Sequence, residues 1–279
     1  MSRTILITGA TGNQGGATLH NLVGKGFTLR AMTRKRDSDK AQALANRGVE
    51  VVEGNLDDPE SLKKALNGVW GVYAVQNTWE AGVTLEEEQG KRLAELARAA
   101  GVEHFVYASV GSAHRETGIP HFDNKCRVEE TIRTLGFPSF VIVRPVFFME
   151  NLLSPWFLNG GTLVSTLDPK TVLQMIAVED VGLFGALAFT RASELNGRAL
   201  DIAGDAVTMP TAAATLSHEL GRPIEYLQIP IAEVRKNSED MALMLEWFDR
   251  VGYEADIAGL QQEFGVKMTS LEAWARKQA

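Results

Sequence analysis

The chain has 279 residues, of which 45% are hydrophobic and 23% are charged. This ordinary globular composition excludes a disordered tail, a collagen-like repeat and a disulfide scaffold. Lys and Arg number 28 against 35 Asp and Glu, so the net charge is −7, which argues against binding to a nucleic-acid backbone.

The single cysteine, Cys126, cannot form an internal disulfide, as fits a reducing compartment. The sequence has no stretch of about 20 apolar residues and does not begin like a secretory leader. We therefore expect a cytoplasmic protein that does not span a membrane.

In the first half of the chain, short apolar runs alternate with longer amphipathic runs. The strands that we expect lie at residues 4–8, 29–33, 49–53, 69–75, 104–108 and 140–143. We expect a first helix that ends near residue 23 and four further helices at 40–47, 59–68, 84–100 and 122–135. Such alternation predicts parallel βαβ units. We therefore expect an α/β fold with a Rossmann-type doubly wound parallel sheet, whose ligand site lies beyond the carboxyl ends of the strands.

After Pro145 the alternation stops, and residues 146–175 are aromatic-rich and irregular. A helix at 179–190 and a strand at 199–202 are expected to return to the main sheet, and mostly helix follows residue 211, with a strand near 224–226. We expect a Rossmann domain at 1–150, with 176–205 returning to its sheet. Residues 151–175 and 206–279 would form a smaller C-terminal α/β lobe for a substrate or partner.

A glycine-rich turn lies directly between the first strand and the first helix. Its sequence, TGATGNQGG at 8–16, places Gly9, Gly12 and Gly15 three residues apart. Glycines allow the backbone to approach a pyrophosphate closely, and the helix N-terminus offers N–H groups and a partial positive charge to it. In this strand–turn–helix context the pattern predicts a dinucleotide site. The alternative is a plain glycine-rich turn.

Three cations, Arg34, Lys35 and Arg36, follow the second strand, where an NAD site usually carries an acidic residue. A guanidinium can bind the 2′-phosphate of NADP(H) through two hydrogen bonds, so we expect NADP(H), with Arg34 as the leading contact. The alternative is a solvated basic loop. Asn55 follows the third strand, and Gln76 and Asn77 follow the fourth. These three residues are either cofactor contacts or ordinary turn residues.

Further stretches, taken together and in order, resemble the NmrA-like family of atypical short-chain dehydrogenases/reductases. Besides the glycine turn, they are Thr33-Arg34, GNLDD at 54–58, Asn77-Thr78-Trp79-Glu80, EQGK at 88–91, VYAS at 106–109, HFDNKCRVEE at 121–130, Arg144-Pro145, FFMEN at 147–151 and SLEAW at 270–274. The resemblance spans nearly the whole chain.

The resemblance implies a Rossmann-type domain that binds NADP(H), followed by a smaller lobe. The dinucleotide contacts that it implies are Gly9, Thr11, Gly12, Asn13, Gln14, Gly15 and Arg34. It also implies that Lys125 reaches the nicotinamide ribose and that Pro145 and Phe148 line the nicotinamide pocket. Members of this group are either redox sensors that bind regulatory proteins or reductases of quinone-like and related small molecules.

The broader short-chain dehydrogenase family uses Tyr-x-x-x-Lys on a helix, with a Ser after the fifth strand. Here the corresponding residues are His121, Lys125 and Ser109, so the lysine is retained and histidine replaces the tyrosine. His121 is either a general acid or a structural residue that lines the cofactor site. Lys125 is a ribose ligand or a solvated lysine, and Ser109 orients a substrate carbonyl or completes a turn.

Two functions follow from these residues. The first is an NADPH-dependent reductase of a small carbonyl, quinone or imine-like compound, and we favour it slightly. The second is a non-catalytic NADPH sensor that regulates a protein partner, which the missing tyrosine favours. No metal site is predicted, because the five histidines and one cysteine form no ligand spacing. The sequence leaves open whether the chain forms a homodimer.

Overall fold

The computed structural model describes residues 3–279, which form one large parallel sheet and two small sheets. The strands of the large sheet are β1 (Thr4–Ile7), β2 (Thr28–Thr33), β3 (Glu50–Glu53), β4 (Gly71–Ala74), β5 (His104–Ala108), β6 (Ser139–Pro145) and β11 (Ala199–Ile202). Their order is β11-β6-β5-β4-β1-β2-β3, and the pairs from β3 to β6 are parallel. This confirms the doubly wound Rossmann-type sheet.

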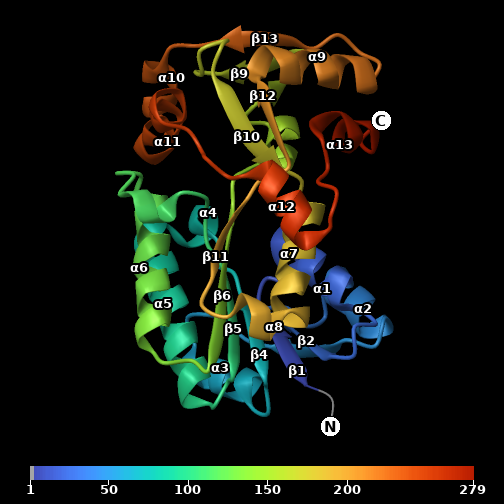
Figure 1. Cartoon of the computed structure of the whole chain (residues 1–279), viewed down its shortest axis with the longest axis vertical. Helices are drawn as coiled ribbons and strands as arrows, with labels where there is room; N and C mark the ends of the chain where they lie inside the picture. The colour runs from blue at the N-terminus through green and yellow to red at the C-terminus, as the bar shows by residue number, and fades with distance from the viewer. Residues whose placement is uncertain (1–2) are drawn as a thin grey trace. The chain divides into compact units, whose positions relative to one another are not determined.

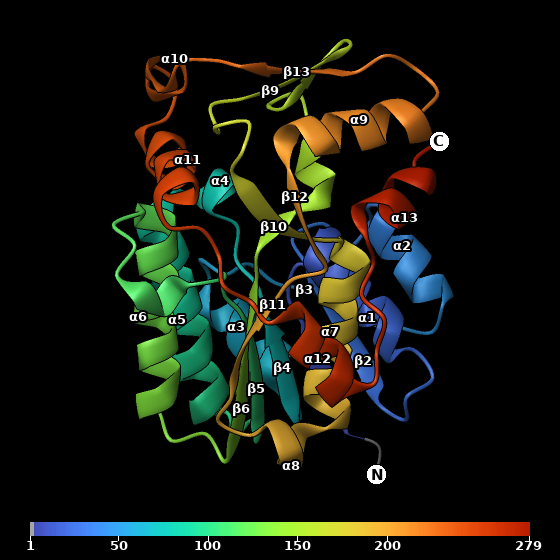
Figure 2. The ribbon, with the colours of Figure 1, turned by 45° about the horizontal axis from the view of Figure 1, so that its top comes forward.

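Helices connect these strands and cover both faces of the sheet (Figure 1). They are α1 (Asn13–Leu22), α2 (Asp39–Asn46), α3 (Pro59–Leu66), α4 (Thr78–Ala81), α5 (Val83–Ala99), α6 (Pro120–Thr134), α7 (Val178–Thr190) and α8 (Ala192–Leu195). Figure 2 shows α3, α5 and α6 on one face, with α1 and α7 on the other. On the α7 face, a Cβ at Gly182 would lie 2.5 Å from the Cβ of Ala17 on α1, so glycine allows the two helices to approach closely.

The sheet core forms because the strands are apolar on both faces. Leu62 of α3, Leu93 of α5 and Val128 of α6 pack with Leu6 and Val72 of the sheet in one fully buried cluster. Side-chain caps fix where the helices start. For example, the Asp58 carboxylate accepts a hydrogen bond from the Glu60 N–H, one residue after Pro59 opens α3.

The remaining elements build two three-stranded sheets and a set of helices. The strands are β7 (Phe147–Phe148), β8 (Leu158–Asn159), β9 (Thr162–Ser165), β10 (Val172–Ile176), β12 (Asp205–Thr208) and β13 (Glu225–Gln228). The helices are η1 (Ala113–Arg115), η2 (Met149–Leu153), α9 (Met209–Glu219), α10 (Ile231–Arg235), α11 (Glu239–Arg250), α12 (Ile257–Phe264) and α13 (Leu271–Arg276). Their shared core includes Phe147, Phe157 and Phe248, with the Phe147 and Phe157 ring centroids 5.3 Å apart.

The chain divides into two compact units. Unit 1 is residues 1–109, 123–144 and 181–200, and unit 2 is residues 110–122, 145–180 and 201–279. The expectation that 146–175 is irregular is wrong, because β7 to β10 lie there. These strands have two to five residues each, and β8 to β10 contain polar residues, so they do not stand out as buried apolar runs in the way that β1 and β4 do. The domain limits drawn from the sequence stay a prediction.

Candidate dinucleotide-binding site

The glycine-rich loop between β1 and α1 is held in a conformation that needs glycine. Gly9 has φ = +59°, and a Cβ there would lie 2.7 Å from Cγ1 of Val75. A Cβ at Gly15 would lie 2.5 Å from the carbonyl oxygens of Thr8 and Gly9, so α1 can approach the strand end only with glycine at this position. Gly12 occupies the N-cap of α1, where it has no side chain to cap the first-turn N–H groups.

Thr8 fastens this loop to the end of β4. Its hydroxyl donates a hydrogen bond to the Val75 carbonyl at 3.0 Å and accepts one from the Val75 N–H at 2.8 Å. The loop is therefore fixed beside the segment that begins with Gln76. Gln76 is buried, and neither of its amide atoms has a hydrogen-bond partner among the described residues, nor has Oε1 of Gln14. Unsatisfied buried amides are costly, which favours a polar ligand at this place.

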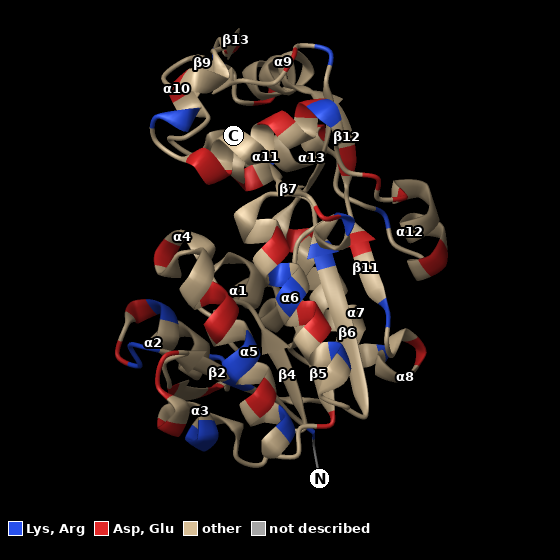
Figure 3. Cartoon of the chain, turned by 90° about the vertical axis from the view of Figure 1, so that its left-hand side faces the viewer, with Lys and Arg blue, Asp and Glu red and all other residues tan. Residues whose placement is uncertain are grey.

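Arg34 follows β2 directly and is 64% exposed. Its Nη2 lies 2.5 Å from Oε1 of Glu80 on α4. Lys35 and Arg36 are exposed as well, and Figure 3 marks basic residues on the loop that leads into α2. The structure thus places a cationic segment at the carboxyl end of β2, next to the strand that carries the glycine loop.

Asn55 and Asn77 both shape turns. The Asn55 side-chain oxygen accepts a hydrogen bond from the Asp57 N–H at 3.1 Å, and the Asn77 oxygen caps α4 through the Trp79 N–H at 3.2 Å. Their turn role is therefore observed, whereas their contact with a cofactor stays a prediction. Thr11 and Asn13 lie in or beside the glycine loop, as expected from their sequence positions.

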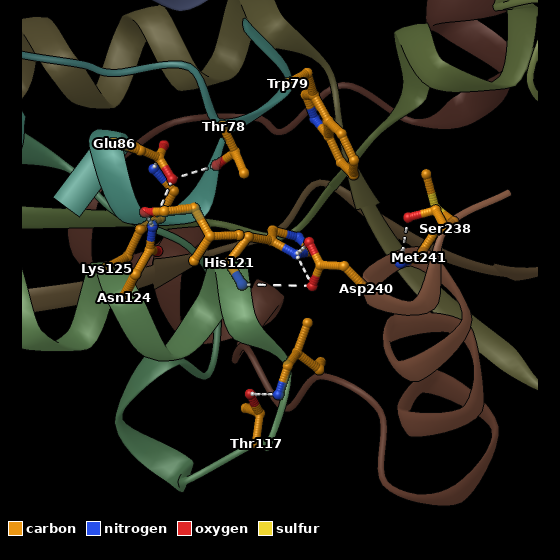
Figure 4. Close-up of polar contacts among 12 residues, drawn as sticks. Thr78, Trp79, Glu86, Thr117, His121, Asn124, Lys125, Ser238, Asp240 and Met241 are labelled. Atoms are coloured by element: carbon orange, nitrogen blue, oxygen red, sulfur yellow. Dashed lines mark hydrogen bonds and ion pairs between the residues drawn. The ribbon is translucent and has the colours of Figure 1, made fainter. Parts of the chain in front are cut away.

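Lys125 on α6 is held in a buried polar network around Glu86 of α5 (Figure 4). Its Nζ lies 2.6 Å from Oε1 of Glu86, and the two side chains are only 11% and 2% exposed. The other oxygen of Glu86 accepts hydrogen bonds from the Asn124 amide at 2.9 Å and from the Thr78 hydroxyl. This arrangement excludes the alternative of a solvated lysine.

The charge of Glu86 is stabilised by the same contacts. Burial by itself would raise the pKa of this carboxyl. The Lys125 ammonium and the hydrogen bonds from Lys125, Thr78 and Asn124 outweigh burial and hold the pKa below its ordinary value. Glu86 therefore stays ionised and keeps the ammonium of Lys125 in place.

Ser109, at the end of β5, is bound into a second buried network. Its hydroxyl donates to Oε1 of Glu129 at 2.5 Å, and the same oxygen accepts a hydrogen bond from Nε of Arg144 at 2.9 Å. All three residues are buried. Ser109 therefore completes an ion-paired cluster between α6 and β6, and its contact with a substrate carbonyl stays a prediction.

His121, at the start of α6, pairs with Asp240 of α11. The imidazole Nδ1 lies 2.8 Å from both carboxylate oxygens, and the His121 side chain is 9% exposed. A carboxylate beside Nδ1 favours a proton on that nitrogen and orients the ring. Both residues belong to unit 2, as do Pro145, the last residue of β6, and Phe148, which lies half-buried in β7.

The acidic partners of these side chains, Glu86, Glu129, Asp240 and Glu80, were missed by reasoning from the sequence. Two of them left a signal. Glu86 precedes Leu93 by seven residues and therefore lies on the apolar stripe of α5, and Glu129 is likewise seven residues after Phe122 on α6. A carboxylate on an apolar stripe indicates a buried ion pair. Asp240 and Glu80 left no such signal.

A doubly wound parallel sheet with a glycine-rich loop after its first strand defines the Rossmann class of α/β folds. Within this class the chain belongs to the NmrA-like family, whose model matches residues 1–277. This confirms the family resemblance.

Several relatives fit this assignment. An NmrA-like family domain-containing protein of Dictyostelium discoideum is 24% identical over 99% of this chain and 98% of its own length. A (4-alkanoyl-5-oxo-2,5-dihydrofuran-3-yl)methyl phosphate reductase of Streptomyces griseus is 31% identical over 83% of this chain and 79% of its own length. An NmrA-like family domain-containing oxidoreductase of Cladobotryum is 33% identical, with matched regions that span 55% of this chain and 49% of the relative.

Solved structures of similar fold include two enzymes crystallised with a nicotinamide cofactor. The triphenylmethane reductase of Citrobacter in complex with NADP(H) has a TM-score of 0.81 and 23% identity, and the match covers 99% of each chain. The NADPH-dependent quinone oxidoreductase of Escherichia coli in complex with NADPH has a TM-score of 0.81 and 25% identity, covering 98% of this chain and 99% of that one.

Among residues 3–279, none of the helices combines the length and the apolar composition that a membrane span requires. In the same part of the chain, no group of three or more His, Cys, Asp and Glu side chains is arranged to hold a metal ion.

Proposed function

We propose that this protein is an NADP(H)-dependent oxidoreductase that reduces a small carbonyl, quinone or imine-like compound. The observation that carries the proposal is the glycine cradle after β1 together with Arg34 directly after the neighbouring strand β2. A pyrophosphate needs the close backbone approach that Gly9, Gly12 and Gly15 allow, and a 2′-phosphate needs a cation where Arg34 lies.

The residues around the glycine-rich loop fit NADP(H). The N–H groups in the first turn of α1, at Asn13 and Gln14, would bind the pyrophosphate, because the helix end is uncapped and carries a partial positive charge. The buried amide of Gln76 would find its hydrogen-bond partner on the bound dinucleotide. Arg34 would bind the 2′-phosphate through two N–H groups.

Lys125 would hold the nicotinamide ribose. An ammonium has three N–H donors, so the bond to Glu86 leaves donors for the ribose hydroxyls. When bound, the reduced cofactor supplies a hydride to the substrate. Because Glu86 stays ionised, the lysine remains fixed while the substrate is exchanged.

Reduction of a carbonyl also requires a proton at its oxygen, and His121 would supply it. Asp240 accepts a hydrogen bond from Nδ1, so Nε2 is the nitrogen that would deliver the proton. His121 and Lys125 are four residues apart on α6, the spacing at which the broader family places its tyrosine and lysine on one helix face.

The relatives support a reductase. They include an NADPH-dependent quinone oxidoreductase, a triphenylmethane reductase and a reductase of a dihydrofuran phosphate. These names have in common the reduction of a small molecule. We extend this reaction to the present chain, with a small electrophile as its substrate.

A second candidate function is a sensor of the NADPH pool. The observation that favours it is the replacement of the family's tyrosine by His121. One nitrogen of this imidazole, Nδ1, is held by the Asp240 carboxylate. A sensor binds the cofactor and changes its affinity for a protein partner. Affinity capture with and without NADPH tests this function, and equal recovery of every partner in both conditions contradicts it.

The reductase is tested by NADPH oxidation with a panel of quinones, triphenylmethane dyes and activated carbonyls. We expect the absorbance of the reduced nicotinamide to fall with at least one electrophile. We also expect Arg34→Glu to raise KM for NADPH and to leave KM for the electrophile unchanged. Tight NADPH binding without turnover on the whole panel would contradict the reductase and favour the sensor.

A further inference from the structure

The ion pair between Arg34 and Glu80 crosses the carboxyl end of β1. Arg34 follows β2 and Glu80 follows β4, and these two strands flank β1 in the sheet. The glycine-rich loop leaves the sheet from β1, between them. The pair therefore spans the edge of unit 1 at which a dinucleotide would enter.

The pair contributes little to folding stability. Arg34 is 64% and Glu80 53% exposed, and an ion pair exposed to water to this degree is weak and screened by salt. It nevertheless brings a carboxylate to 2.5 Å from the guanidinium that would bind the 2′-phosphate. A phosphate that binds a guanidinium through two N–H groups also uses Nη2, the nitrogen that Glu80 contacts, so the phosphate and the carboxylate compete for it.

Glu80 is placed by its helix, which is anchored from the other side. α4 has only four residues, and its first residue, Thr78, donates a hydrogen bond to the buried Glu86 that also holds Lys125. Its N-cap, Asn77, fixes the first turn through the Trp79 N–H. Glu80 is thus presented to Arg34 by a short helix. Figure 4 shows the hydrogen bond from Thr78 to Glu86 that ties this helix to the buried network of α5 and α6.

We propose that Glu80 is a specificity-determining residue that weakens the preference for NADP(H) over NAD(H). This inference rests on the proposed function. The carboxylate competes with the 2′-phosphate for Nη2 of Arg34, whereas NAD(H), which has a hydroxyl in place of the phosphate, meets no such competition. Glu80 therefore lowers the affinity for the phosphorylated cofactor selectively.

The test is calorimetric titration of the whole chain with NADPH and with NADH at low salt. The variant Glu80→Gln keeps the size of the side chain and removes its charge. We expect it to bind NADPH about two- to fivefold more tightly, the range that exposed ion pairs reach, with NADH affinity changed by less than about twofold. Adding salt should reduce the gain.

The matched control is Glu60→Gln, which removes one negative charge from another exposed ion pair, with Lys63 at 2.7 Å on α3. It should leave both affinities unchanged. A second control places Glu80→Gln in an Arg34→Ala background, where the gain should vanish because no guanidinium remains to be released.

Two results would overturn the inference while the proposed function stands. The first is an affinity for NADPH that is equal or lower in Glu80→Gln than in a wild type that binds NADPH. The second is a gain that persists without Arg34 or that appears equally for NADH or in Glu60→Gln. Failure of the well-folded wild type to bind either cofactor overturns the proposed function itself, and this inference with it.

Discussion

The glycine-rich loop and helix α6 contribute to the candidate site in opposite ways. The loop acts through its backbone, and the glycine at position 15 is required by residues of the same turn, because a Cβ there would meet the carbonyl oxygens of Thr8 and Gly9. Only Gly9 faces a distant residue, Val75. Helix α6 acts through the side chains of His121, Lys125 and Glu129, and each of these is held by an oppositely charged or polar group from elsewhere in the chain. A backbone site is therefore specified locally, whereas a side-chain site is specified by tertiary packing.

The largest effect should come from His121, if α6 supplies the proton. His121→Ala should lower kcat by about 10²- to 10⁴-fold, with a small change in KM for NADPH, because loss of a general acid affects the transition state. The measurement is steady-state turnover with an electrophile that the wild type reduces. His114→Ala, on an exposed residue of η1, is the matched control.

Turnover that stays within about threefold of wild type would assign His121 a structural role. Asp240→Asn sharpens this comparison. It keeps the shape of the partner but removes the carboxylate that orients the ring through Nδ1, so kcat should fall with little change in KM for NADPH. An unchanged kcat would separate Asp240 from the chemistry.

The next largest effect should be a loss of unfolding free energy when the buried ion pair of α6 is removed. Glu129→Ala leaves the buried Arg144 without its carboxylate and Ser109 without its acceptor, and should lower the free energy of unfolding by about 3–5 kcal/mol. Urea denaturation measures it. Glu130→Ala, the exposed neighbour on the same helix, should change the free energy by less than about 0.5 kcal/mol. Equal losses of unfolding free energy for the two variants would show that the buried ion pair contributes no more to stability than an exposed carboxylate does.

A smaller effect is expected in the loop. Gly15→Ala forces a Cβ to within 2.5 Å of two carbonyl oxygens and should cost about 1–3 kcal/mol, together with weaker NADPH binding. Gly16→Ala is the matched control, since its Cβ would lie 3.2 Å from the Ala10 carbonyl oxygen and alanine favours the helix. Equal urea midpoints for the two variants would show that a Cβ at Gly15 is accommodated, and would contradict the claim that α1 approaches the strand end too closely for a side chain there.

The smallest effect is a pH dependence that distinguishes two buried carboxyls. The contacts of Glu86 lower its pKa, so its stabilising contribution is complete above the ordinary carboxyl pKa and is lost as the pH falls through the lowered value. Wild type should therefore lose stability more steeply than Glu86→Gln from about pH 5 downward. The measurement is the free energy of unfolding against pH.

Glu150 of unit 2 is the control with the opposite sign. Burial raises the pKa of its carboxyl, in spite of hydrogen bonds from the Val178 N–H and the Trp274 indole. Its stabilising contribution is present below the ordinary pKa and is lost as the pH rises through the raised value, so Glu150→Gln should change the slope in the other direction. Slopes of the same sign for both variants would contradict these assignments.

The sequence predicts much of unit 1 and, in unit 2, the helices after residue 211 and strand β13, but not β7 to β10 or β12. The strands of the large sheet lie within about two residues of their expected ends, because each is a buried apolar run between turn residues. β8 to β10 and β12 are about as short as β1 and β4 but contain polar residues, so they do not stand out as buried apolar runs. Among the candidate site residues, the glycines could be interpreted from their spacing together with the strand–turn–helix context.

The side chains of the site could be named but not placed. Lys125 follows from the Tyr-x-x-x-Lys comparison, but its partner Glu86 lies 39 residues away, and the partner of His121 lies 119 residues away. Such pairings depend on how helices pack, which a single sequence does not encode locally. Arg34 was predicted from its position after β2, while its contact with Glu80 depends on the short helix α4.

Isothermal titration of the folded protein with NADPH and NADH tests the central claim most directly. If the loop after β1 binds the pyrophosphate and Arg34 binds the 2′-phosphate, NADPH binds saturably and more tightly than NADH, and Arg34→Glu removes this preference. Absence of saturable heat with both cofactors, or an unchanged preference in Arg34→Glu, would contradict the account.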